Sequence, residues 1–128
     1  MAAHAPYSIP DRRKPTPEER SLLKFLLERH APNRLVEVDT LKVVARCGCG
    51  KCPTVLFGQK LDAEPLTGSP FVQVASYRGK NKDGVTVGVV LIERQGKLAE
   101  LEAWSPHGPD VKSWPPVAAL PPRVRCCS

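Results

Sequence analysis

Several features of common protein classes are missing from this sequence. Aromatic residues make up only 5% of its 128 residues, and no stretch approaches the roughly 20 apolar residues of a membrane-spanning helix. Residues 1–15 contain no apolar run between a basic start and a small-residue cleavage site, which argues against a secretory signal. We therefore expect a cytoplasmic protein without membrane contact, whose five cysteines stay reduced.

Enzyme motifs are missing as well. There is no glycine-rich phosphate loop and no metalloprotease helix. The histidines His4, His30 and His107 share no recognisable motif with a serine or a cysteine. Glu100 and Glu102 lie on one face of an expected strand, but their alternation with apolar residues is typical of a solvent-facing side. The sequence therefore predicts a protein that is not an enzyme.

What the sequence does contain is ordinary for one globular domain. Its hydrophobic content is 41% and its charged content 25%, and the chain is long enough to bury a core. A net charge of +6 gives a mildly basic surface that favours an acidic partner. We expect an irregular segment over 1–15, a single α+β domain over 16–104, and a proline-rich tail over 105–128 that packs on the domain.

The stretch TPEERSLLKFLLERH predicts an amphipathic N-terminal helix. Thr16 is a suitable N-cap, Pro17 occupies the first helical position, and Glu19 has the spacing of a capping box. Leucines recur at helical spacing after it and form one apolar stripe. Pro32 ends the helix, and a short helical turn over 33–39 is left open.

From residue 41 onward the pattern is that of β-strands. Five β-branched or alternating segments follow one another: LKVVARC, CPTVLFG, FVQVASYRG, VTVGVVLIER and KLAELEAW. Turn residues at 81–84 and 94–97 predict hairpins, so we expect an antiparallel meander of about five strands, with the helix packed on it. Apolar residues occupy both faces of strand 85–94, and the helix covers one face. The tail is expected to cover the other, which would otherwise be an interaction surface.

The segment RCGCGKCP concentrates three cysteines within six residues. Cys47, Cys49 and Cys52, with glycines between them, have the spacing of zinc-binding thiolates. A structural zinc site needs a fourth ligand, and no second paired motif supplies it at the usual spacing. Candidates from elsewhere in the chain are His107, His30, Cys126 and Cys127.

Two other interpretations of this segment stay open. The simpler interpretation is a glycine-rich hairpin connection whose thiols act as small, partly buried hydrophobic groups. Cys49 and Cys52 also form a redox-type pair in which Lys51 would favour a thiolate, although such pairs usually act from a helix N-terminus. No cofactor is required by either interpretation, and zinc is required only by the metal hypothesis.

A set of basic and aromatic residues is the candidate for binding a partner. Its members combine positive charge with aromatic anchors, and they are Tyr77, Arg78, Lys80, Lys82, Trp104 and Trp114. The two tryptophans are also candidates for packing the tail. Binding of single-stranded RNA is the weaker interpretation because exposed aromatics interleaved with the basic residues are few.

Four stretches carry a resemblance to known proteins: TPEERSLLKFLLE, LKVVARCGCGKCPTVLF, GVTVGVVLIERQGKLAELEAWS and SWPP. Together they resemble a group of uncharacterised small bacterial single-domain proteins with a PxEE helix and an RCxCG…CP hairpin. The size, the α+β pattern and the lack of catalytic motifs are also similar to immunity proteins of bacterial toxin systems, including contact-dependent growth inhibition.

The second resemblance implies a non-enzymatic, protein-binding function. Such a protein would neutralise a cognate toxin, here one with an acidic surface because this chain is basic. The alternative hypothesis is a small zinc-stabilised module built on Cys47, Cys49 and Cys52, with or without nucleic-acid binding.

Overall fold

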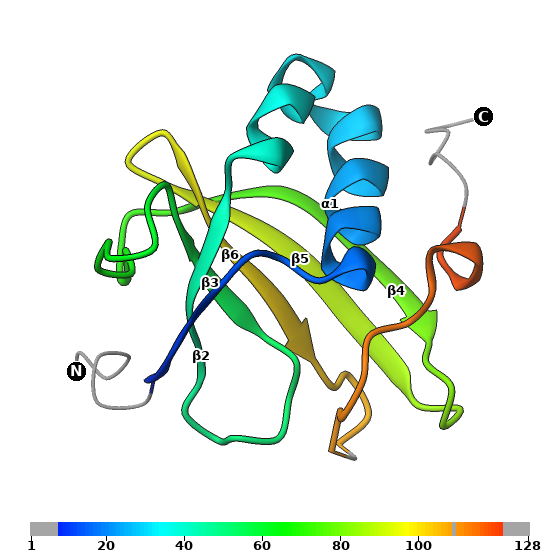
Figure 1. Ribbon diagram of the computed structural model, residues 1–128. Coiled ribbons are helices and arrows are strands. Elements are labelled where there is room, and N and C mark those ends of the chain that lie inside the picture. The colour runs from blue at the N-terminus through cyan, green and yellow to red at the C-terminus, as the bar shows by residue number, and fades with distance from the viewer. Residues whose placement is uncertain (1–7, 109, 122–128) are drawn as a thin grey trace.

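A six-stranded antiparallel sheet with helices on one face forms the α+β fold (Figure 1). It is seen in a computed structural model that describes residues 8–108 and 110–121. The sheet is open, and its strand order is β1-β2-β3-β6-β5-β4. The strands are β1 (Ser8–Arg13), β2 (Lys42–Cys47), β3 (Val55–Gly58), β4 (Val72–Lys80), β5 (Thr86–Arg94) and β6 (Lys97–Trp104).

The strand count corrects the sequence-based prediction of about five. The additional strand is β1, which lies where the sequence predicted an irregular segment and pairs antiparallel with β2. Its sequence SIPDRR lacks apolar alternation and contains Pro10, a residue tolerated on edge strands because it needs no partner for an N–H. An edge strand of this kind carries almost no periodic signal.

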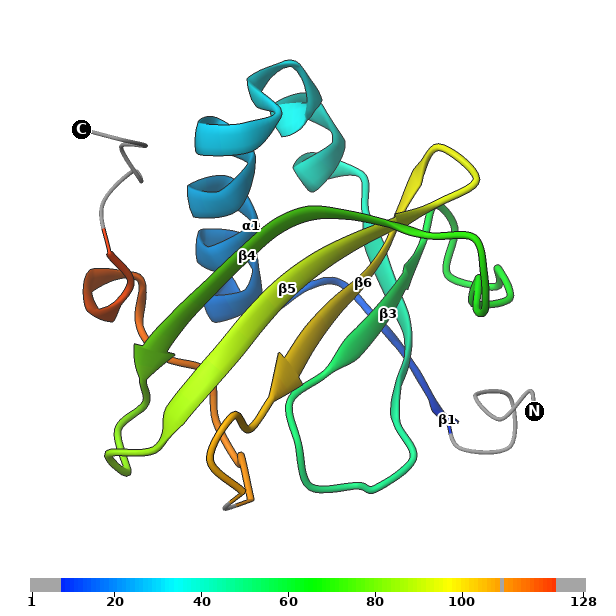
Figure 2. The same ribbon diagram turned by 180° about the vertical axis from the view of Figure 1, so that it is seen from behind.

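The sheet consists of two meanders joined in its middle, and not of one continuous meander. Strands β1, β2 and β3 form the first, and β4, β5 and β6 form the second. They are joined by the pairing of β3 with β6, in which Val55 lies opposite Leu101. Figure 2 shows β4, β5, β6 and β3 side by side. The predicted hairpins at 81–84 and 94–97 are both present.

Helix α1 (Pro17–His30) begins with the predicted capping box. Thr16 Oγ1 accepts a hydrogen bond from the Glu19 N–H at 3.1 Å, and Glu19 Oε1 accepts one from the Thr16 N–H at 2.8 Å. A 3₁₀ helix, η2 (Pro32–Asp39), follows it, and a second, η3 (Val117–Ala119), lies near the end of the described chain. Among the described residues, no helix combines the length and the apolar character needed to cross a membrane.

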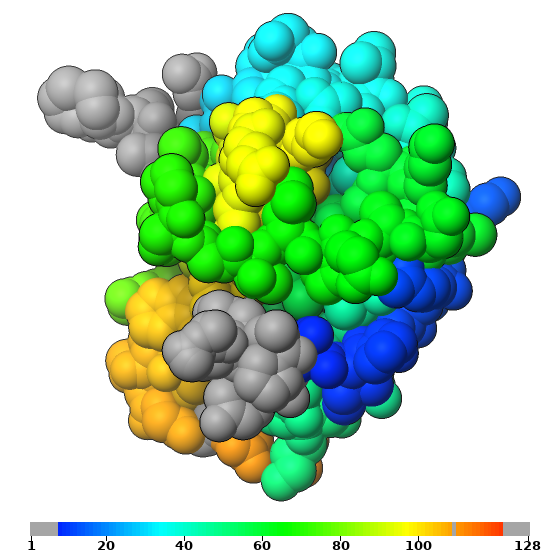
Figure 3. Space-filling view, turned by 90° about the vertical axis from the view of Figure 1, so that its left-hand side faces the viewer, coloured from blue at the N-terminus to red at the C-terminus, as the bar shows by residue number. Residues whose placement is uncertain are grey.

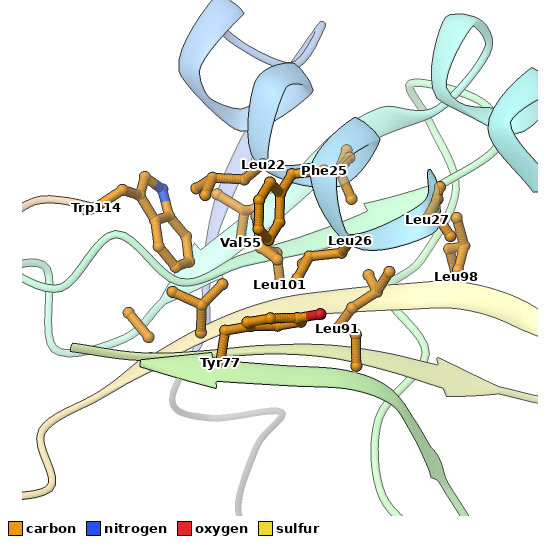
Figure 4. Packing of buried hydrophobic residues seen from close by; sticks show 14 of the residues in the cluster. Leu22, Phe25, Leu26, Leu27, Val55, Tyr77, Leu91, Leu98, Leu101 and Trp114 are labelled. Carbon is orange, nitrogen blue, oxygen red and sulfur yellow. The ribbon is translucent and has the colours of Figure 1, made fainter. Parts of the chain in front are cut away.

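The hydrophobic core lies between α1 and the inner face of the sheet (Figure 4). Leu22, Leu26 and Leu27 of the helix are at most 1% exposed. The segment after β6 contributes to this same core, because Val111, Trp114 and Leu120 belong to it. Figure 1 shows this segment running beside α1 and β4.

The apolar residues of the described tail join the core on the inner face of the sheet, and not the outer face that the sequence predicted. Val90 and Ile92 of the outer face are buried, and the loop 59–71 reaches the end of β5 at Arg94. In that loop the Gly68 carbonyl accepts a 2.7 Å hydrogen bond from Arg94, whose guanidinium also pairs with the buried Glu100 at 2.9 Å. Figure 3 shows this loop packed beside the β5–β6 hairpin. This contact is local to the segment that directly precedes β4.

Candidate metal centre

The three cysteines lie in the connection between β2 and β3, at one end of the sheet (Figures 1 and 2). Cys47 ends β2, and Cys49 and Cys52 lie in the turn that follows. We call residues 46–54 the cysteine loop. It is held at its base by a hydrogen bond from the Cys47 N–H to the Thr54 carbonyl, at 3.2 Å. The sequence-based placement of the cluster between two strands is thus confirmed.

A tight turn brings the three thiols together. The Gly50 N–H donates to the Cys47 carbonyl at 3.1 Å, and Gly50 has a φ of +74°, a conformation that residues with a Cβ rarely adopt. As a result, the Sγ atoms of Cys47, Cys49 and Cys52 all lie within 4.8 Å of one another. Sulfur ligands at about 2.3 Å on a tetrahedron are ~3.8 Å apart. Only a small closure would therefore be needed to place them around one ion.

The sulfur of Cys49 is already surrounded by hydrogen-bond donors. The backbone N–H groups of Cys52 and Lys51 donate to Cys49 Sγ at 3.2 and 3.3 Å. These two bonds stabilise a negative charge on the sulfur and lower the pKa of the Cys49 thiol to about 7. The turn therefore stabilises the thiolate form, which is the form that binds a metal ion.

The other two thiols have more enclosed surroundings. Burial raises the pKa of the Cys47 thiol to about 12, because the thiolate would lose solvent there. The Cys52 thiol donates a hydrogen bond to Thr54 Oγ1 at 3.4 Å. Thr54 Oγ1 in turn accepts from the Ala103 N–H at 2.9 Å. This chain of bonds connects the cysteine loop to β6, one of the two middle strands of the sheet.

No histidine or carboxylate of the described residues joins the three sulfurs. His107 is exposed in the segment after β6 and lies outside the group. His30 is engaged elsewhere, since its Nε2 lies 2.8 Å from the Tyr77 hydroxyl. Cys126 and Cys127, the other candidate ligands, lie outside the described residues. Within the described chain, the arrangement offers three ligands and leaves one tetrahedral position for another donor.

The predicted partner-binding residues separate into two groups. Tyr77 and Trp114 are each only 4% exposed and belong to the core, so they offer a partner almost no surface. Arg78, Lys80 and Lys82 are exposed. Adjacent residues of a strand point to opposite faces, which is why Tyr77 faces the core while Arg78 faces outward.

Trp104 completes an outward-facing row across three strands. Arg78 of β4 lies opposite Gly88 of β5, which lies opposite Trp104 of β6. The indole of Trp104 lies directly over Gly88, where an added Cβ would be 2.0 Å from the indole nitrogen. The Arg78 guanidinium lies 5.3 Å from the centroid of the same indole. A glycine inside a strand often marks such a close approach, and this is the sequence signal that could have located the row.

Comparison of the chain with protein-family models, with curated proteins and with solved structures finds no match in any of the three.

Proposed function

We propose that this protein is a small non-enzymatic metal-binding module whose cysteine loop holds a zinc ion. The observation that supports the proposal is the convergence of three Sγ atoms within 4.8 Å on one glycine-bent turn. Thiolate ligands favour soft or borderline metals, and zinc binds them tetrahedrally. Cys47, Cys49 and Cys52 are its proposed ligands.

The fourth ligand in this proposal comes from water, from a partner, or from another part of the chain. The two hydrogen bonds that Cys49 Sγ already accepts support zinc binding by the cysteine loop, because a ligand that is oriented by its neighbours loses less freedom on binding. Binding would release the protons of the thiols, so zinc affinity is expected to rise with pH.

Zinc stoichiometry and affinity test this function. The purified full chain, titrated with zinc against a chromogenic chelator, is expected to bind one ion per chain. Each of Cys47→Ser, Cys49→Ser and Cys52→Ser is expected to weaken binding by more than the roughly 10–100-fold that loss of a ligand's hydrogen-bonding neighbour costs.

Two control variants locate the fourth ligand. If His107→Ala binds zinc as the parent chain does, His107 is not a ligand. The zinc affinity of the Cys126→Ser/Cys127→Ser double variant tests the terminal cysteines in the same way. Binding of less than a trace of zinc by the parent chain, or zinc affinity in the three single cysteine variants equal to that of the parent chain, would contradict the proposal.

A second candidate function is binding of an acidic protein partner, as in toxin neutralisation by an immunity protein. The observation that favours it is the outward row of Arg78 and Trp104, extended by exposed Lys80 and Lys82. Arginine and tryptophan are typical of residues that dominate binding energy at interfaces, and the positive charge complements an acidic toxin surface.

Co-expression with the product of the neighbouring reading frame tests this second function. The two chains are expected to elute together in size-exclusion chromatography. Arg78→Glu and Trp104→Ala are expected to weaken the complex by at least tenfold, whereas Lys97→Glu, a change on the β5–β6 hairpin away from the row, serves as the matched control. If the product of the neighbouring reading frame is not toxic and does not bind this chain, toxin neutralisation is contradicted.

A further inference from the structure

A cavity lies directly beside the cysteine loop. It has a volume of about 360 Å³, within the range of pockets that hold small molecules. Its walls come from the end of β1, the first turn of α1, the cysteine loop and the segment after β6. The lining residues on which the inference rests are Arg46, Lys51, Lys112, Ser113 and Trp114.

Two adjacent residues of this wall have buried polar atoms without a hydrogen-bond partner. They are Trp114, through its indole Nε1, and Ser113, through its Oγ, and neither atom has a partner within the described part of the chain. Trp114 is 4% exposed, and Figure 4 shows its nitrogen on the edge of the indole that faces away from the sheet. An indole N–H can only donate, and buried donors are nearly always paired. These two polar groups therefore lack a partner within the described chain.

The charges around the cavity favour a negatively charged acceptor. Asp11 and Glu19 also line it, but Arg13 binds both: its Nε lies 3.2 Å from Asp11, and its two terminal nitrogens lie 2.9 and 3.0 Å from Glu19. The remaining lining cations, Arg46, Lys51 and Lys112, make no ion pair with any other described residue. They face a single further carboxylate, that of the exposed Glu18.

We propose that this cavity binds a small molecule through an oxyanion, a carboxylate or a phosphate group. The oxygens of that group accept hydrogen bonds from Trp114 Nε1 and Ser113 Oγ, while Arg46 and Lys112 neutralise its charge. Oxyanions suit the wall because each oxygen accepts more than one hydrogen bond and carries negative charge. None of these four residues is a proposed zinc ligand, so the site exists with or without a metal ion.

Binding of the anion can be followed by NMR through the indole N–H resonance of Trp114. The ¹⁵N-labelled full chain contains two tryptophans and gives two indole resonances, which the Trp104→Phe variant assigns. Inorganic phosphate and malonate are added in separate titrations, with sodium chloride holding the ionic strength constant. The Trp114 resonance is expected to shift along a saturating curve with at least one of the two anions, and the Trp104 resonance is expected to stay in place.

Variants connect that shift to the cavity. Arg46→Gln and Lys112→Gln, changes of side chains that are not buried, are each expected to weaken binding at least tenfold. Lys82→Gln, an exposed lysine of the β4–β5 turn, is the matched control and is expected to bind as the parent does. The chain with all three loop cysteines replaced by serine is expected to bind the anion unchanged, which separates this site from the zinc site.

The same titrations identify the group or overturn the inference. Saturation by phosphate alone assigns a phosphate ligand, and saturation by malonate alone assigns a carboxylate. A linear shift, equal movement of both indoles, or equal binding by Lys112→Gln and Lys82→Gln overturns it.

Discussion

Among single residues, Cys49 differs most from its neighbours in chemistry. It is exposed, two backbone N–H groups donate to its sulfur, and the pKa of its thiol is lowered to about 7. The thiolate is the reactive form. In the metal-free protein we therefore expect the rate of Cys49 alkylation by iodoacetamide to rise with a midpoint near pH 7, measured by mass spectrometry of quenched samples. Cys47, whose pKa is raised to about 12, is expected to react much more slowly below pH 9.

The Cys49→Ser variant is the control, and it is expected to lose the fast phase of this reaction. A midpoint at pH 9 would show that the two backbone N–H groups do not stabilise the thiolate. The two pKa shifts also act on stability with opposite signs. The lowered pKa of Cys49 stabilises the fold above pH 9, and this contribution is lost as pH falls through 7. The raised pKa of Cys47 stabilises it below pH 9, and this contribution is lost as pH rises toward 12.

The residues of the candidate site were predictable from sequence only in part. The spacing of the three cysteines predicts that their sulfurs converge, because a turn with glycines brings close neighbours together. Burial is harder to predict: residue type groups Tyr77 with Arg78, although strand alternation places the two side chains on opposite faces. The unpartnered nitrogen of Trp114 could not be predicted, because it depends on what three distant segments bring near it.

At the scale of elements, β1 and α1 are joined by one ion pair. Arg13 of β1 makes two hydrogen bonds to Glu19, whose side chain is only 6% exposed and also completes the helix cap. Arg13→Leu leaves this carboxylate without its cation, so we expect a loss of about 2 kcal/mol in the free energy of unfolding. Urea denaturation of the full chain measures it.

Arg20→Leu provides the comparison for that measurement. Arg20 pairs with Asp39 at 3.0 Å, but both side chains are more exposed, at 34% and 73%. Exposed pairs contribute less than about 1 kcal/mol, so the Arg20 variant is expected to be clearly the more stable of the two. Equal losses would mean that the burial of Glu19 adds nothing to its pairing with Arg13.

Elements with local signals were the predictable ones. The capping box at Thr16 and the turn residues of two hairpins lie within a few residues of the structure they specify, and the helix and both hairpins are confirmed. β1 has no such pattern and forms because β2 offers an unpaired edge. The pairing of β3 with β6 joins segments about 45 residues apart in the chain. Local sequence patterns do not predict a strand pairing over such a separation.

At the scale of the whole molecule, the segment after β6 belongs to the core. Val111, Trp114 and Leu120 are 4–6% exposed. Burial of a large apolar side chain contributes about 1.5–3 kcal/mol, so their joint loss is comparable with the roughly 5–15 kcal/mol that stabilises a typical domain. A chain that stops after Asp110 is therefore expected to show no cooperative thermal transition in near-ultraviolet circular dichroism.

A chain that stops after Pro121 is the matched control, because it keeps all three side chains. It is expected to melt cooperatively, near the temperature of the full chain. A cooperative transition of similar midpoint in the shorter chain would mean that residues 1–110 carry the stability by themselves.

The cysteine loop has one more consequence, and it concerns the order of events during synthesis. All three proposed ligands lie within six consecutive residues and need no distant strand to bring them together. The unfolded chain therefore presents nearly the same ligands as the folded one, and a metal ion that binds both states stabilises the fold less than its affinity suggests. A zinc ion could then be loaded as the loop leaves the ribosome, before β6 exists to pair with β3.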